Sequence, residues 1–189
     1  MPNSKKKKQD FFGEEGLFAN AVLIACGISF LLFLIFLGLV AIYSEKDWLL
    51  HQAFQSYMFA FIMFAISGAF IFPYESKRII DIIVRVIVGI FIIFASVNTF
   101  FNGTLLLMDK EAYDTKQYEI VVGYPEDPEF YTTKGQPSRV DNIYVNDIII
   151  DAGKIGLTGK EYNEQWEGKE IRFYYLPHSK MVMKWEYAF

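Results

Sequence analysis

Residues 86–108 read VIVGIFIIFASVNTFFNGTLLLM, a run of 23 residues without Asp, Glu, Lys or Arg. A helix needs about 20 predominantly apolar residues to cross a hydrocarbon core of about 30 Å, so this run predicts a transmembrane helix. The next three residues, Asp109, Lys110 and Glu111, are all charged, and 10 basic and 15 acidic residues follow Met108. The chain therefore changes from membrane sequence to soluble sequence at Met108.

Two more apolar runs lie before this one, at residues 17–43 and 48–72, and they also lack charged residues. We predict a transmembrane domain of three helices over 17–108 (17–43, 48–72 and 79–108), a basic tail at 1–16 and a β domain at 109–189. The first run is longer than the apolar region of a signal peptide, so we expect an uncleaved anchor. The fold class is a membrane α-helical protein with a C-terminal all-β domain, either a small barrel or a curled antiparallel sheet.

Basic residues in the short connecting segments predict the orientation, because cytoplasmic loops carry an excess of Lys and Arg. The N-terminal tail has Lys5–Lys8, the first loop has only Lys46, and the segment before the third run has Lys77, Arg78 and Arg85. This pattern places the N-terminus in the cytoplasm and, after three crossings, the β domain outside the cell membrane. We therefore expect a multi-pass protein located in a bacterial cell membrane.

The C-terminal domain shows the alternation of β-strands rather than the period of a helix. Asn146-Asp147 separates two apolar segments and is typical of a tight hairpin turn. Pro177 lies in a second turn, because proline is barred from a central strand. Strands are expected at 118–122, 139–145, 148–150, 169–175 and 181–187, with a short helix near 160–167.

The partner of the β domain is predicted to be a protein or an envelope component. The net charge of the β domain is near −5 (10 basic and 15 acidic residues), which argues against nucleic acid as the partner. Large aromatic side chains are typical of binding surfaces, although they also fill small cores. The surface candidates are Tyr124, Phe130, Tyr131, Trp166 and Trp185. The acidic stretch at 126–129 is expected to lie in a loop, as a lid or as solvated slack.

Polar side chains recur inside the second and third apolar runs, where they are costly in lipid. They are His51, Gln52, Gln55, Ser56, Asn98 and Asn102. One interpretation is that they join the two helices by hydrogen bonds, with Gln55 and Asn102 at matching depths. The alternative is a polar vestibule for an ion or small ligand. Asp81 and Arg85, four residues apart, are expected to form an ion pair at the cytoplasmic interface.

Residues for chemistry are scarce. His51 and His178 are the histidines and Cys26 is the only cysteine, so no intrachain disulfide can form. Neither histidine has a metal-ligand spacing, and no hydrolase, metalloprotease or phosphate-loop motif occurs. We therefore expect no catalytic residue, no metal and no cofactor, and we interpret His178-Ser179-Lys180 as an exposed turn.

The segment Gly168–Lys180, GKEIRFYYLPHSK, resembles the closing hairpin of small β modules attached to multi-pass membrane proteins of Gram-positive bacteria. It is similar in plan to the OB-like tails of NfeD-type proteins. The resemblance is limited to this hairpin. It implies a membrane-tethered, non-enzymatic scaffold or partner-binding module, and it brings no catalytic residues with it.

The leading hypothesis is a non-enzymatic integral membrane protein whose β domain binds a protein or envelope component. Its expected partners are the lipid bilayer and either another protein or a second copy of the chain. A rival hypothesis places the function in the helices, as an oligomeric channel or transporter subunit or as an immunity-type protein. That rival rests on the intramembrane polar residues.

Overall fold

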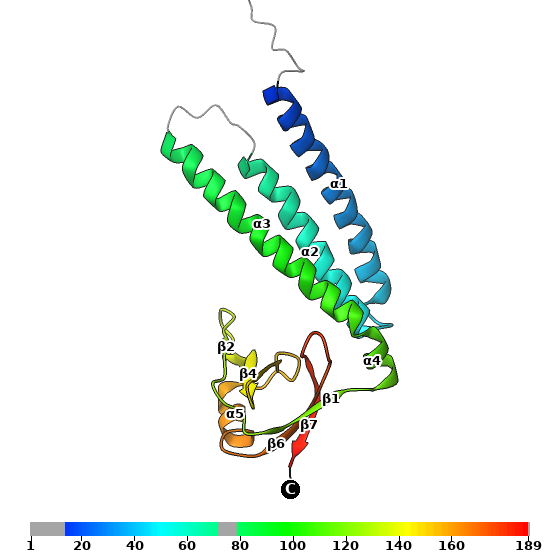
Figure 1. Ribbon diagram of the computed structural model, residues 1–189, viewed down its shortest axis with the longest axis vertical. Helices are drawn as coiled ribbons and strands as arrows, with labels where there is room; N and C mark the ends of the chain where they lie inside the picture. The colour runs from blue at the N-terminus through cyan, green and yellow to red at the C-terminus, as the bar shows by residue number, and fades with distance from the viewer. Residues whose placement is uncertain (1–13, 72–78, 189) are drawn as a thin grey trace, which may run out of the picture. The chain divides into compact units, whose positions relative to one another are not determined.

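The computed structural model describes residues 14–71 and 79–188 and contains three long helices (Figure 1). They are α1 (Glu14–Tyr43), α2 (Trp48–Ile71) and α3 (Ile79–Met108). Each contains a segment long and apolar enough to cross a membrane, which confirms the predicted three-helix membrane part. The predicted basic tail falls almost entirely outside the described residues, as do Lys77 and Arg78.

Helices α1 and α2 pack through aromatic side chains. Asp47 begins α2 by accepting a hydrogen bond from the backbone N–H of Leu50 at 3.0 Å, which satisfies one of the free donors at a helix start. Phe36 of α1 then lies with its ring centroid 5.1 Å from Tyr57 and 5.5 Å from Phe61 of α2. These offset contacts bury large apolar area between the two helices.

Helices α2 and α3 approach closely at two points. The Ser96 hydroxyl of α3 donates to the Ala60 carbonyl oxygen of α2 at 2.7 Å, in a buried position. Gly103 packs so tightly that a Cβ added to it would lie 3.1 Å from the Ala53 carbonyl oxygen. Small residues at a helix interface allow this approach, so the face of α3 containing Ser96 and Gly103 is turned towards α2.

The chain divides into two compact units, Met1–Gly103 and Thr104–Phe189, so the end of α3 belongs to the second unit. The other elements of this unit are α4 (Lys110–Thr115), β1 (Glu119–Gly123), β2 (Phe130–Tyr131), β3 (Arg139–Val140), β4 (Asn142–Val145), β5 (Ile148–Asp151), α5 (Gly159–Gln165), β6 (Ile171–Tyr175) and β7 (Val182–Tyr187). The predicted strands are present within about two residues of their expected bounds, except that 139–145 is divided into β3 and β4. Neither α4 nor β2 was predicted.

The strands form three small antiparallel sheets rather than a closed barrel. One sheet has the order β1-β6-β7, and the other two are the pairs β2–β3 and β4–β5. The antiparallel prediction is therefore confirmed, whereas the barrel option is wrong. Sheets that do not close leave edges. Isolated bridges add further backbone pairing: Glu126 pairs with Tyr144 of β4, and Asp151 of β5 pairs with Met181.

The core of the β unit lies between these sheets and α5. Strand β6 alternates as expected, with Ile171, Phe173 and Tyr175 buried. Asn146 and Asp147, with φ of 49° and 65°, form the predicted turn of the β4–β5 hairpin, because a tight hairpin needs positive φ at both positions. The buried cluster comprises Val121, Val140, Ile143, Val145, Ile150, Ala152, Leu157, Tyr162, Trp166, Ile171, Phe173, Tyr175 and Val182.

Strand β7 departs from simple alternation because of a β-bulge. Tyr175 pairs with Val182, but Tyr174 pairs with Lys184, which leaves Met183 as the extra residue. An extra residue reverses the inward face of the strand. Val182 on one side of the bulge is therefore fully buried, and Trp185 on the other side also packs against the core.

Candidate functional site

Three of the five predicted aromatic candidates are exposed on the β unit. Tyr124, Phe130 and Tyr131 have 40% to 53% of their surface accessible. Trp166 is fully buried at the centre of the core, so its prediction as a surface residue is wrong. Trp185 is partly buried and packs with its ring centroid 5.6 Å from that of Trp166. Trp166 therefore belongs to the core of this small domain, and Trp185 packs against that core.

A buried tyrosine supports two of the exposed aromatics. The Tyr162 hydroxyl donates to the carbonyl oxygen of Pro125, next in sequence to Tyr124, at 3.0 Å. The Tyr162 ring also meets Phe130 edge-on, with centroids 6.2 Å apart. Burial raises the pKa of Tyr162, which keeps the hydroxyl protonated as a donor. Tyr124 and Phe130 are thus placed by a rigid part of the core.

Strands β2 and β3 pair as a short two-stranded ribbon, which together with its connection we call the aromatic arm (residues 130–140). Residues 129–137 are all exposed. Successive residues of a strand point to opposite faces, so Phe130 lies towards Tyr162 and Tyr131 faces the other way. The connection is stabilised by a 2.6 Å hydrogen bond between the hydroxyls of Thr132 and Ser138. The arm can therefore offer an aromatic side chain on each face.

The acidic stretch before the arm is held by hydrogen bonds rather than being slack. Glu126 and Tyr144 exchange two backbone hydrogen bonds, of 2.8 and 3.0 Å. The Glu129 carboxylate accepts a hydrogen bond from the Asn142 side chain at 2.8 Å. Within residues 14–71 and 79–188, no three His, Cys, Asp or Glu side chains are grouped so that they could hold a metal ion.

Asp109 is the main functional candidate that sequence reasoning missed. It follows α3 directly and is fully buried. One carboxylate oxygen accepts the backbone N–H of His178 at 2.9 Å and the other accepts that of Ser179 at 2.7 Å. Two successive N–H groups in a turn form a concavity that suits an anion. Asp109 thus links the end of α3 to the β6–β7 turn, and an acidic residue directly after an apolar run was the available signal.

The outer face of β6 and β7 carries a charged network centred on Glu186. Its carboxylate accepts hydrogen bonds from Tyr174 at 2.6 Å, Arg172 at 3.1 Å and Lys184 at 3.2 Å. The hydrogen bond from Tyr174 is the largest of the effects that lower the pKa of Glu186 to about 2. The network joins neighbouring strands on the exposed face and has the character of a structural support.

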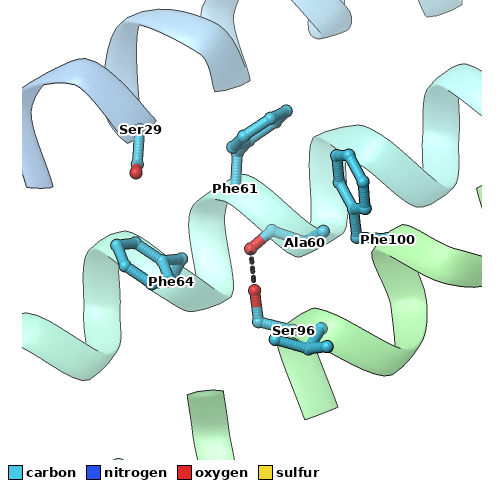
Figure 2. Close-up of a pocket in the computed structure, with 7 residues that line it drawn as sticks. Ser29, Ala60, Phe61, Phe64, Ser96 and Phe100 are labelled. Carbon is cyan, nitrogen blue, oxygen red and sulfur yellow. Dashed lines mark hydrogen bonds between the residues drawn. The ribbon is translucent and has the colours of Figure 1, made fainter. Parts of the chain in front are cut away.

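The membrane unit contains a cavity of about 320 Å³ between its three helices. Figure 2 shows Ser29 of α1 on one side, Phe61 and Phe64 of α2 beside it, and Ser96 and Phe100 of α3 on the other side. The volume is at the lower end for small-molecule sites. Aromatic and small side chains form its walls, which suits an apolar occupant such as a lipid chain better than an ion.

The predicted intramembrane polar residues do not all gather at one interface. His51 Nδ1 lies 3.2 Å from the Val40 carbonyl oxygen and so connects α2 with α1. Ser56 donates to the Gln52 carbonyl oxygen within α2 at 3.0 Å, and Gln55 is partly buried.

On α3, Asn98 and Asn102 are exposed, because Ser96 and Gly103 occupy the face towards α2. No hydrogen bond joins Gln55 and Asn102 among the described residues, so the prediction that this pair joins the two helices is wrong.

Asp81 and Arg85 both lie on the first turns of α3, and both side chains are exposed. Their spacing places them on neighbouring turns of one helix face. Their role as an interfacial ion pair stays a prediction.

Comparison with family models, with curated proteins and with solved structures finds no match to this chain. The plan implied by the resemblance to NfeD-type proteins, apolar helices followed by a small antiparallel β domain, is present. Membership of that family stays a prediction, and the functional argument rests on the chain's own geometry.

Proposed function

We propose that this chain is a non-enzymatic membrane protein whose β unit binds a protein or envelope component outside the cell membrane. The helices act as the anchor, and the aromatic arm with Tyr124 is the binding surface. The orientation follows from the distribution of basic residues described above. The role is that of an accessory or scaffold protein that presents a folded domain on a membrane anchor.

The observation that carries this proposal is the exposure of Tyr124, Phe130 and Tyr131 on a well-supported ribbon. Aromatic side chains contribute large contact area at low entropic cost and are enriched in binding hot spots. None of these three rings belongs to the buried cluster of the β unit. Rigid support from Tyr162 also reduces the entropy lost on binding.

The β unit continues directly from the third helix of the anchor. The β unit includes the last residues of α3, and Asp109 fixes the β6–β7 turn to that helix end.

Site-specific photo-crosslinking in intact cells tests the proposal. A photo-reactive phenylalanine analogue is placed at Tyr131, and in a matched control at Ile149, which is also exposed but lies on β5. We expect a crosslinked product of defined mass from position 131 and none from position 149. Absence of products from positions 124, 130 and 131, or equal products from position 149, would contradict the proposal.

The rival function, a channel or transporter subunit or an immunity-type protein, rests on the intramembrane polar residues. Its support is weakened by the placement of Asn98 and Asn102 on the side of α3 away from Ser96. Replacing Gln55 and Asn102 with Leu separates the hypotheses. A channel would lose flux in reconstituted vesicles, whereas a binding protein would keep its crosslink from position 131.

A further inference from the structure

Helix α3 has an outer face that no other described helix covers. Ser96 marks the face packed against α2. Two residues correspond to a rotation of about 200° on an α-helix, so Asn98 lies on the opposite side. Phe91, Phe94 and Phe101 share this side and are 59% to 73% exposed. We call Phe91, Phe94, Asn98 and Phe101 the outer seam.

The outer seam has the spacing of a helix-pairing surface. Its members are three, four and three residues apart, which is the spacing of the a and d positions in a coiled coil. Left-handed packing with this spacing is also the common geometry of transmembrane bundles. Any single face of an α-helix has this spacing, so Asn98 is what distinguishes the outer seam from a lipid-facing surface.

Asn98 is the member of the outer seam that disfavours contact with lipid alone. It lies ten residues before Met108, about 15 Å along the helix axis, which is near the middle of a core of about 30 Å. Between Val86 and Met108 the exposed polar side chains are Asn98 and, one turn later, Asn102. In the described part of the chain neither carboxamide is hydrogen-bonded to another residue. Unpaired polar groups at this depth are costly and usually face a protein neighbour.

We propose that the outer seam of α3 pairs with the same seam of a second copy of this chain, with Asn98 at the centre of a parallel dimer. The inference does not depend on the proposed binding function of the β unit.

Two properties of Asn98 favour a second copy over another partner. A carboxamide has both a donor and an acceptor, so two asparagines can satisfy each other by reciprocal hydrogen bonds. Copies inserted in the same orientation place Asn98 at the same depth, and a two-fold axis along the membrane normal then brings the two side chains together. Another protein would need a polar group at that same depth.

Cysteine crosslinking of the full chain in lipid vesicles tests the seam. The background is Cys26→Ser, and Phe101→Cys reports on the seam. Leu31→Cys is the control, because Leu31 is similarly exposed near the middle of α1. We expect disulfide-linked dimers from position 101 and few from position 31. Equal crosslinking from both positions would show random collision and would overturn the proposal.

Energy transfer between separately labelled copies tests the role of Asn98. We expect association of the purified chain in vesicles to weaken by about tenfold or more in Asn98→Leu and to be largely kept in Asn98→Gln. Leucine is compatible with lipid, so insertion of that variant is not at risk. Unchanged association in Asn98→Leu, or a purified chain that stays monomeric at all lipid ratios, would overturn the proposal. Association seen only when other membrane proteins are present would also overturn it, in favour of a different partner.

Discussion

The substitution Asp109→Asn should lower the free energy of unfolding of the β unit. The two carboxylate oxygens accept separate N–H groups, from His178 at 2.9 Å and from Ser179 at 2.7 Å. An amide keeps one acceptor, but its NH2 group must then face the second N–H. One charged hydrogen bond becomes neutral, and one partly buried backbone donor loses its partner.

The expected loss follows from these two changes. A hydrogen bond to a charged group contributes about 1.5 to 3 kcal/mol, and a buried donor without a partner costs about 1 to 3 kcal/mol. Allowing for overlap between them, the free energy of unfolding of the β unit should fall by about 2 to 4 kcal/mol. For a domain of this size, the melting temperature should fall by roughly 10 to 20 °C.

The assay is thermal unfolding of the full chain in detergent, followed by tryptophan fluorescence. Trp166 and Trp185 lie in or against the core of the β unit and report on it. The control is Asp114→Asn, which removes an exposed ion pair with Lys110 and should cost less than about 1 kcal/mol. Hydrogen exchange of the β6–β7 turn amides should also accelerate in Asp109→Asn only. If the melting temperature of Asp109→Asn fell no further than that of the control, the hydrogen bonds between Asp109 and the β6–β7 turn would not stabilise the unit.

Three further predictions concern pH and close packing. The pKa of Glu186 is lowered from its ordinary value of 4.5 to about 2, so its network stabilises the fold fully above pH 4.5 and loses this contribution as pH falls towards 2. Glu186→Gln should therefore flatten the dependence of the melting temperature on pH over that window. An unchanged pH profile would contradict the network's role. Burial raises the pKa of Asp151 above its ordinary value of 3.8, so ionisation of this carboxyl lowers the stability of the fold as pH rises from 3.8 through the raised pKa. Asp151→Asn should therefore have a higher melting temperature than the wild type at pH 7 but not below pH 3.8. A variant with a lower melting temperature at pH 7 would refute this. In the membrane unit, Gly103→Val should lower the free energy of unfolding by about 1 to 3 kcal/mol, because an added Cβ lies 3.1 Å from the Ala53 carbonyl oxygen. Gly38→Val is the control, because an added Cβ there has nothing within 4 Å. Equal melting temperatures of the two variants in detergent would show that the close approach at Gly103 does not stabilise the unit.

Much of the architecture follows from sequence periodicity. Each apolar run is long enough to cross the hydrocarbon core of a bilayer as a helix. It must be helical there, because backbone groups in lipid have to form their hydrogen bonds within the segment. Strand β6 and the turn at Asn146-Asp147 were also predictable, because alternation and turn chemistry are local properties. The helix bounds of α2 and α3 agree with the predicted ends to within one residue.

The parts that could not be predicted depend on contacts between distant residues. The rotation of α3 that turns Gly103 towards α2 and leaves Asn102 exposed is set by packing, and depth alone cannot reveal it. The burial of Trp166 depends on which elements surround α5. Asp109 meets the turn at His178 from a position 69 residues earlier. Pairings of this kind leave no periodic pattern in the sequence.

The most direct test of the account is the side of the membrane on which the β unit lies. Lys134→Cys in a Cys26→Ser background places one exposed thiol in the connection of the aromatic arm. A membrane-impermeant maleimide should label this thiol in intact cells, as expected for a domain that meets its partner outside. Labelling only after the membrane has been opened would place the domain in the cytoplasm and contradict both the charge argument and the proposed function.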